Sequence, residues 1–260
     1  MWECPDYFNI DGQGILTLSP IDYTKKTDDQ PGYTNQAIYV PVSFDAKEGT
    51  MQISGTSQLL DLGEDIYAAQ STLDKEGQRT LIGWMRMPLP EADGQWIGMM
   101  SLPRVLHYQQ DGLYTLPHPD IASSFNQPCG DFHAAKARKL VVDLNLGGSI
   151  NIGGYRIAYK EDGCLYTDRS KVFPDDQHIA ATFKTPELKQ CHLEIYTDLH
   201  IIEIFINGGK YVLSNIVYNL KNDLRFENIQ RFEIYQREHK KLSDFKKPLL
   251  TMAFLIKSVT

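Results

Sequence analysis

One stretch decides the fold class of this chain: Ile201-Ile202-Glu203-Ile204-Phe205-Ile206-Asn207-Gly208-Gly209. Its first six residues are mostly β-branched or aromatic, which favours an extended strand. Asn207-Gly208-Gly209 separates this run from a second apolar run, and Asn and Gly supply the positive φ that a tight hairpin loop needs. The stretch therefore predicts two antiparallel strands joined by a hairpin.

The same pattern continues on both sides of this stretch. Further runs rich in β-branched and aromatic residues lie at Ile15–Leu18, Ala37–Phe44, Leu81–Met85, Lys139–Leu146 and Leu193–Tyr196. Turn-forming pairs lie between runs, at Asp11-Gly12, Asp93-Gly94, Asp111-Gly112 and Asp162-Gly163. Helical periodicity is scarce, and we expect at most one short helix, between Ile121 and Arg138. Short strands at this spacing indicate an all-β sandwich, barrel or propeller.

The composition changes near the middle of the chain. Before residue 117 the sequence is dense in aromatic, Met and Pro residues, whereas after residue 138 the strands alternate more regularly. Between them, Pro117-His118-Pro119, Ser123-Ser124, Pro128 and Gly130 are typical of a linker. We therefore predict a first domain over residues 1–116, a linker over 117–138 and a second domain over 139–260.

Composition narrows the class of function. The net charge is −7 with no basic run, which argues against nucleic acid and an anionic membrane surface. No apolar stretch approaches the roughly 18 residues of a spanning helix. The first residues have no signal-peptide pattern, so we expect a cytoplasmic protein. The four cysteines form no pair or cluster at metal-ligand spacing, which predicts reduced thiols and no metal site.

The first candidate for chemistry is Trp2-Glu3-Cys4-Pro5-Asp6. Apolar neighbours disfavour the charged form of a carboxylate, and a carboxylic acid that stays protonated can donate a proton to a leaving oxygen. From these five residues alone, an exposed Glu at a frayed terminus explains the pattern at least as well.

Five segments resemble glycoside hydrolase family 32, the family of invertases, sucrose-6-phosphate hydrolases, inulinases and levanases. Met1-Trp2-Glu3-Cys4-Pro5-Asp6-Tyr7-Phe8 resembles the acid/base motif. Asp61-Leu62-Gly63-Glu64-Asp65-Ile66-Tyr67-Ala68-Ala69-Gln70 is similar to the family's Asp-Tyr-Gly-x-Asp-Phe-Tyr-Ala-x-Gln segment. Trp84-Met85 and the stretch 96–104 are similar to its Gly-Trp-Met segment and Leu-Pro-Arg strand. The stretch 197–214 resembles the signature of its C-terminal sandwich.

The resemblance implies a fold and a mechanism. Family members have a five-bladed β-propeller followed by a β-sandwich, so residues 1–116 would be the C-terminal blades of a partial propeller and 139–260 the sandwich. The active site is of the retaining type, in which one carboxylate attacks the anomeric carbon and the other first donates and then removes a proton. Such hydrolysis needs no cofactor.

The resemblance also assigns site residues. Glu3 matches the acid/base, and Cys4 matches a neighbouring position that lines the pocket. Tyr67 matches an aromatic whose hydroxyl lies near the acid/base, although an ordinary strand Tyr explains it equally from the residues alone. Trp84 matches a tryptophan bordering the fructose site, where an aromatic face suits a sugar's C–H surface, although core packing is the commoner fate of such a Trp.

Three acidic residues within the matched motifs receive no chemistry. We expect Asp6 and Asp65 to cap turns, as Asp at strand ends commonly does. We expect Glu203 to be structural or interfacial, at an alternating polar position of a half-exposed strand. The chain also departs from the family pattern at Ile66, at Ala69 and at Ser19-Pro20-Ile21-Asp22, which leaves its substrate preference open.

The family's nucleophile and transition-state stabiliser lie in Asn-Asp-Pro and Arg-Asp-Pro motifs, and neither string occurs in this chain. We therefore expect a hydrolase of β-D-fructofuranosides, sucrose or sucrose 6-phosphate, that is inactive alone. Unpaired edges of a partial propeller invite pairing, so we expect a complementary N-terminal half or self-association as partner. The alternative is a non-catalytic remnant that serves as a carbohydrate-binding or oligomerising module.

Overall fold

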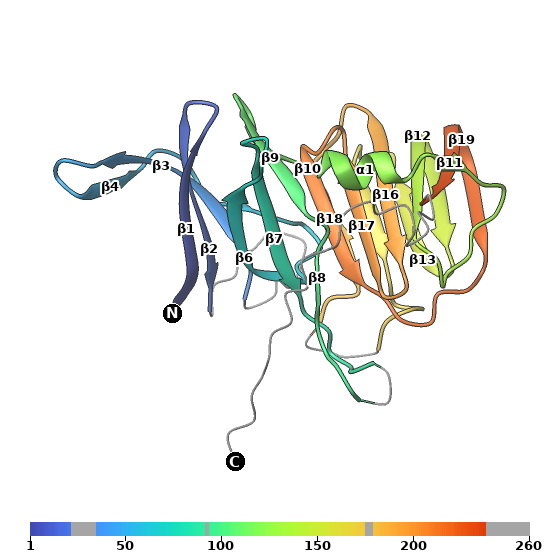
Figure 1. Ribbon diagram of the computed structural model, residues 1–260. Coiled ribbons are helices and arrows are strands. Elements are labelled where there is room, and N and C mark those ends of the chain that lie inside the picture. The colour runs from blue at the N-terminus through green and yellow to red at the C-terminus, as the bar shows by residue number, and fades with distance from the viewer. Residues whose placement is uncertain (22–34, 92–93, 175–178, 238–260) are drawn as a thin grey trace, which may run out of the picture.

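A computed structural model describes residues 1–21, 35–91, 94–174 and 179–237. Within these residues nearly all regular structure is antiparallel β, in three sheets, with one short helix (Figure 1). The all-β prediction is therefore confirmed. None of the helices in the described ranges is long and apolar enough to span a membrane.

The first sheet is formed by strands within residues 2–20 and 38–59, in the order β1-β2-β3-β4, with the short β5 also pairing with β3. Its strands are β1 (Trp2–Ile10), β2 (Gln13–Pro20), β3 (Ile38–Asp45), β4 (Thr50–Ile53) and β5 (Gln58–Leu59). Asp11-Gly12 forms the turn between β1 and β2, and both residues have positive φ. The β3–β4 hairpin extends away from the rest of the molecule (Figure 1).

The second sheet contains residues 66–117 in the order β10-β9-β7-β6, with β8 pairing with β7. Its strands are β6 (Ile66–Leu73), β7 (Arg79–Met85), β8 (Met99–Met100), β9 (Arg104–Gln109) and β10 (Gly112–Pro117). Side chains of the two sheets, among them Phe8, Ile15, Ile66, Leu81 and Leu106, form one buried cluster. Successive small antiparallel sheets that pack on one another are the arrangement of propeller blades.

The third sheet forms the sandwich. Its strands are β11 (Gln127–Pro128), β12 (Arg138–Ile152), β13 (Tyr155–Tyr159), β14 (Leu165–Asp168), β15 (Thr182–Lys184), β16 (Cys191–Asp198), β17 (Ile201–Ile206), β18 (Tyr211–Ile216) and β19 (Leu224–Gln236). The first half of β12 pairs with β16, its second half pairs with β13, and β19 pairs with both halves. The two halves therefore belong to two layers that enclose a common apolar core.

A bend in β12 makes this arrangement possible. The pairing with β19 shifts register between Leu144 and Ser149, around Gly147-Gly148. Gly147 has φ +77°, and a Cβ on Gly148 would lie 2.6 Å from the carbonyl oxygen of Asn228. Glycine at both positions lets one continuous strand pass from one layer to the other.

The predicted strands coincide with observed strands, except that the run Ala37–Phe44 begins one residue before β3, and Asn207-Gly208-Gly209 has positive φ at all three residues between β17 and β18. The helix α1 (Pro119–Ser124) begins two residues before the predicted window. The stretch 117–138 also contains β11 and the buried Phe132, so it packs against the sandwich. The domain boundaries themselves stay a prediction, and Asp22, Asp93 and residues 238–260 lie outside the described residues.

Buried ion pairs join the second sheet to the sandwich. Arg104 on β9 contacts Asp61 at 2.9 Å and Glu203 on β17 at 2.6 Å, and all three side chains are fully buried. Along β17, Ile202, Ile204 and Ile206 face the sandwich core, while Glu203 faces Arg104. Glu203 is thus interfacial, which is one of the two roles expected for it. The expectation of a half-exposed strand was wrong, because the second sheet covers the outer face of β17 at this residue.

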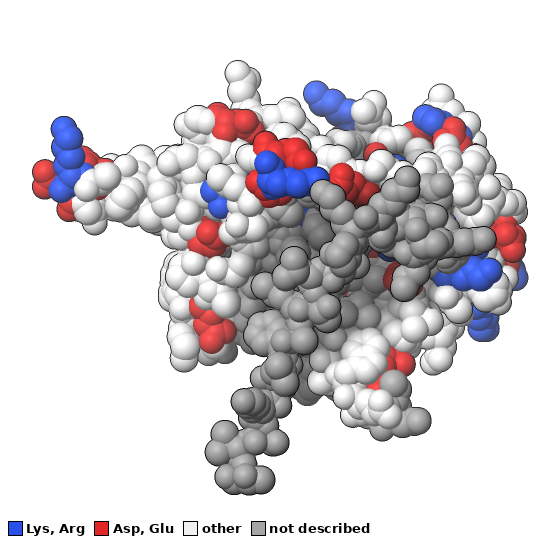
Figure 2. Space-filling view, viewed as in Figure 1, with Lys and Arg blue, Asp and Glu red and all other residues white. Residues whose placement is uncertain are grey.

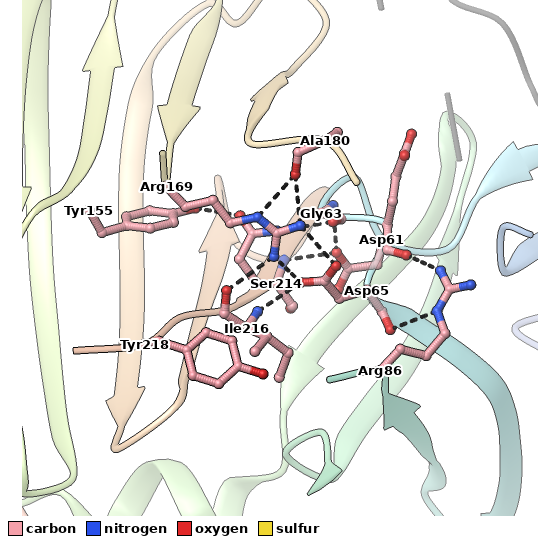
Figure 3. A network of polar contacts seen from close by, with 12 residues as sticks. Asp61, Gly63, Asp65, Arg86, Tyr155, Arg169, Ala180, Ser214, Ile216 and Tyr218 are labelled. Carbon is pink, nitrogen blue, oxygen red and sulfur yellow. Dashed lines mark hydrogen bonds and ion pairs between the residues drawn. The ribbon is translucent and has the colours of Figure 1, made fainter. Parts of the chain in front are cut away.

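A second ion pair lies beside the first. Asp65 accepts from both terminal nitrogens of Arg169 and from the backbone N–H of Ile216, as Figure 3 shows. Asp61 accepts from the backbone N–H of Gly63 and of Ser214, at 2.8 Å each. A Cβ on Gly63 would lie 1.9 Å from the Ser214 carbonyl oxygen, so only glycine allows this approach. The expectation that Asp65 caps a turn was wrong.

Candidate active site

Glu3 lies on β1 at the edge of the first sheet, where its backbone pairs with Ser19 of β2. The Tyr67 hydroxyl, on β6 of the second sheet, lies 2.9 Å from Glu3 Oε2 and 2.7 Å from the Ser19 carbonyl oxygen. The Glu3 side chain is half-buried, whereas Tyr67 is buried. The two sheets thus bring together a carboxyl and a phenol that are 64 residues apart.

Two β-bulges frame this contact. Between Glu3 and Asp6 the strand β1 has one residue more than β2, and Cys4 within it has φ +48°. Between Tyr67 and Gln70 the strand β6 has one residue more than β7, and Ala68 has φ +50°. Positive φ is uncommon for residues other than glycine, and bulges often re-aim a side chain beside an active site.

The surroundings of Tyr67 keep its hydroxyl protonated. Burial, followed by the hydrogen bond and the charge of Glu3, raises the pKa of Tyr67 to about 12. The Arg86 guanidinium lies over the Tyr67 ring, 5.0 Å from its centroid, and acts in the opposite direction. Tyr67 is therefore a neutral hydrogen-bonding partner of Glu3 over the whole physiological pH range.

Trp84 lies next to Tyr67. The two residues are directly paired across β6 and β7, so their side chains share one face of the second sheet. Trp84 is 43% exposed, so it is not a core tryptophan. Gly98 packs against its ring: a Cβ there would lie 2.3 Å from Trp84 Nε1. An accessible indole beside the Glu3–Tyr67 pair is suited to the C–H surface of a sugar ring.

Cys4 contributes its backbone at this site. It is half-buried, and its carbonyl oxygen accepts a hydrogen bond of 2.9 Å from the Gln70 side chain. Glu3, Tyr67 and Trp84 are thus neighbours in the fold, while the part that the Cys4 thiol plays stays a prediction. Ser19, Asp6, Gln70 and Arg86 were not assigned to this site. Asp6 and Gln70 lie within the matched motifs, but their roles depend on partners in the other sheet.

Asp6 has a role different from the expected turn cap. Its Oδ2 accepts from the backbone N–H of Ser71 at 2.8 Å and from the Ser71 hydroxyl at 2.6 Å, across the two sheets.

Among the described residues, no group of three or more His, Cys, Asp or Glu side chains is arranged to hold a metal ion.

A cavity of about 430 Å³ lies elsewhere, where the first two sheets meet the sandwich. Its walls include three tyrosines and two lysines: Tyr39, Tyr114, Tyr211, Lys184 and Lys210. None of the four predicted site residues lines it. This cavity is therefore separate from the Glu3 site.

Family models match almost the whole chain. The glycosyl hydrolases family 32 N-terminal domain matches residues 1–117, and the glycosyl hydrolases family 32 C-terminal domain matches residues 125–246. Together the two models cover both the pair of small sheets and the sandwich.

Curated relatives agree with the family models. A sucrose-6-phosphate hydrolase of Vibrio alginolyticus is 31% identical over 235 residues, which are 83% of this chain and 48% of that protein. A sucrose-6-phosphate hydrolase of Bacillus subtilis is 29% identical over 240 residues, 82% of this chain and 48% of that protein. The chain therefore spans about half the length of these relatives.

Solved structures share the fold. The sucrose-6-phosphate hydrolase from Lactobacillus gasseri superposes with a TM-score of 0.75 at 20% identity, covering 92% of this chain and 55% of that one. A Bombyx mori β-fructofuranosidase in complex with sucrose gives a TM-score of 0.73 at 21% identity, covering 91% of this chain and 55% of that one. The matched motifs, the family models and the shared fold agree, and the chain belongs to glycoside hydrolase family 32.

Proposed function

We propose that this chain supplies the acid/base half of a retaining hydrolase of β-D-fructofuranosides, with sucrose or sucrose 6-phosphate as substrate. The observation that carries the proposal is the Glu3–Tyr67 pair, held beside an accessible Trp84 in a member of this family. The relatives' names support the substrate class, because they include sucrose-6-phosphate hydrolases.

In the proposed mechanism Glu3 acts twice. It first protonates the oxygen that leaves the anomeric carbon, and it then removes a proton from the water that attacks the glycosyl-enzyme intermediate. Tyr67 keeps one oxygen of Glu3 in place through both steps, so the other oxygen is available to the substrate. The Trp84 ring supports the apolar side of the sugar.

The nucleophile must come from outside the described site. The chain contains no Asn-Asp-Pro string, and a single acid cannot form the covalent intermediate that a retaining mechanism requires. We therefore propose that a complementary N-terminal half, which carries that motif, associates with this chain. The half-length match to the relatives supports this proposal.

The first sheet offers a surface for such a partner. Val42 and Ile53 are directly opposite each other in the β3–β4 hairpin, as are Phe44 and Met51. Ile53 is 75% exposed and Phe44 is 45% exposed. On the face in Figure 2 the charged side chains of this hairpin gather at its tip and leave the rest of the arm uncharged. Exposed apolar residues on an edge hairpin favour association with another sheet.

Fructose release tests the proposal. The purified chain is assayed with sucrose and with sucrose 6-phosphate, alone and mixed with the separately produced upstream half of a sucrose-6-phosphate hydrolase. We expect no release alone, release in the mixture, and no release when the chain carries Glu3→Gln. Release by the chain alone, or an unaffected Glu3→Gln mixture, would contradict the proposal. Sedimentation of the mixture should show pairing that Ile53→Lys weakens, while Leu73→Lys, at another exposed apolar position, does not.

A non-catalytic carbohydrate-binding or oligomerising module is the second candidate. The cavity lined by three tyrosines supports it, because aromatic faces suit sugar rings. In that case sucrose would perturb NMR signals of Tyr114 and Tyr211, and Glu3→Gln would leave binding unchanged. Perturbation confined to residues around Glu3 would argue against this candidate.

A further inference from the structure

Hydrogen bonds from side chains join the first sheet to the second beside Glu3. Among the described residues, the strands of the first sheet and those of the second form separate sheets. Besides Tyr67, three side chains connect the two sheets beside Glu3: Ser19 on β2, Asp6 on β1 and Gln70 on β6. Each of them bonds to a residue within or next to one of the two bulges.

Ser19 has three connections at once. Its backbone pairs with Glu3, its carbonyl oxygen accepts from the Tyr67 hydroxyl at 2.7 Å, and its side-chain hydroxyl accepts from the backbone N–H of Ala68 at 2.9 Å. Its side chain is buried, with 1% of the residue exposed. Ser19 thus contacts both members of the Glu3–Tyr67 pair and the residue with positive φ that follows Tyr67.

Asp6 connects the two strands on the other side of the bulges. It follows the bulge of β1 and binds both the backbone N–H and the hydroxyl of Ser71, which follows the bulge of β6. The Gln70 amide reaches back to the carbonyl oxygen of Cys4 at 2.9 Å. The two bulges are therefore bonded to each other on both sides of Cys4 and Ala68.

The strained residues need this support. Non-glycine residues at positive φ persist only where their surroundings hold them, since a regular strand costs less energy. Loss of a bulge would shift the register by one residue and turn the side chains of that strand to the opposite face. Glu3 and Tyr67 would then no longer meet.

We propose that Ser19 and Asp6 are positioning residues for the acid/base: they hold the two bulges in register so that the Tyr67 hydroxyl meets Glu3 Oε2. The inference rests on the proposed role of Glu3, and its test does not require catalysis.

The test measures nuclear Overhauser effects between the Tyr67 ring protons and the Glu3 side chain in the 260-residue chain. Ser19→Ala removes the oxygen that accepts from the Ala68 N–H, so these effects should lose most of their intensity. Ser19→Thr retains the hydroxyl and should restore them. Asp6→Ala and Asp6→Asn both remove the charge, but Asn keeps an oxygen for Ser71, so the loss should be larger in Asp6→Ala than in Asp6→Asn.

Asp11→Ala is the matched control. Asp11 also joins the two sheets, by accepting from the backbone N–H of Tyr108 at 2.7 Å, but it lies at the opposite end of β1. Asp11→Ala should lower the melting temperature and leave the Overhauser effects between Tyr67 and Glu3 unchanged. If Ser19→Ala lowers the melting temperature and leaves these effects at full intensity, the positioning role is wrong. Failure of the fructose assay would instead contradict the proposed function and leave this result intact.

Discussion

At the scale of single residues, the Tyr67 hydroxyl has one proton and two partners, Glu3 Oε2 and the Ser19 carbonyl oxygen. When Glu3 is protonated on its other oxygen, which faces the substrate, Oε2 still accepts from the Tyr67 hydroxyl. An ionised Glu3 accepts from Tyr67 through the same oxygen. Glu3 therefore keeps a hydrogen bond to Tyr67 in both protonation states, as a group that acts first as acid and then as base requires.

Removal of the Tyr67 hydroxyl should lower the activity of this chain when it is mixed with the upstream half. A hydrogen bond to a charged group is worth about 1.5–3 kcal/mol, so Tyr67→Phe should lower kcat/KM for sucrose or sucrose 6-phosphate by about 10- to 100-fold. Steady-state kinetics measure the effect. Tyr7→Phe, whose hydroxyl contacts only Asn9 at 3.4 Å, serves as control and should retain full activity. Equal activities in both variants would show that Tyr67 has no part in the reaction.

At the scale of elements, hairpin turns connect the second sheet to the sandwich as well as joining neighbouring strands. The β9–β10 turn holds Asp111, and the hairpin between β17 and β18 holds Lys210, whose ammonium group pairs with Asp111. A Cβ on Gly209 of the same hairpin would lie 2.3 Å from the Thr115 carbonyl oxygen of β10. Gly209 thus has two functions: it forms part of this hairpin and allows its close contact with the second sheet.

This contact should weaken in acid. The hydrogen bond from Lys210, more than any other cause, lowers the pKa of Asp111 below its usual 3.8. A lowered folded-state pKa means that the stabilisation is complete above the unfolded value and is lost as the pH falls through the folded value. Asp111→Asn should therefore flatten the decline of unfolding free energy below about pH 4, measured by urea denaturation across pH. If the unfolding free energy of Asp111→Asn declines below pH 4 as steeply as that of the original chain, the Lys210–Asp111 contact does not cause the decline.

At the scale of the whole molecule, the junction between the second sheet and the sandwich is unusually polar for a buried surface. Two arginines and three carboxylates lie there without access to solvent. Charges taken out of water cost free energy, and they are tolerated here because each is bonded to oppositely charged or backbone partners.

Breaking one of these pairs should destabilise the entire chain. Glu203→Gln leaves Arg104 buried with Asp61 as its remaining carboxylate, and removal of one buried partner costs about 3–5 kcal/mol. Urea unfolding measures the loss. Glu233→Gln removes one partner of the exposed Arg231–Glu233 pair and should change little. Similar stabilities for the two variants would mean that the junction does not depend on its charges.

The sequence determined the strands, the hairpins and the family motifs of this protein. Alternating apolar residues and turns such as Asn207-Gly208-Gly209 act over a few residues, so their structure can be predicted locally. Glu3, Tyr67 and Trp84 could be named as a site because whole motifs surround them. The prediction did not depend on knowing that their strands are adjacent.

Only the tertiary structure decided which polar residues hold these pieces together. Asp6 and Asp65 were expected at turns, yet each bonds across two sheets. Glu203 was expected to be structural or interfacial, but its partner Arg104 could not be named. Nothing in the sequence around Ser19 shows that it contacts three residues of the site. The partners of Asp6, Asp65 and Glu203 are 65 to 104 residues away, and the energy of a buried hydrogen bond or ion pair depends on that partner rather than on neighbours in sequence.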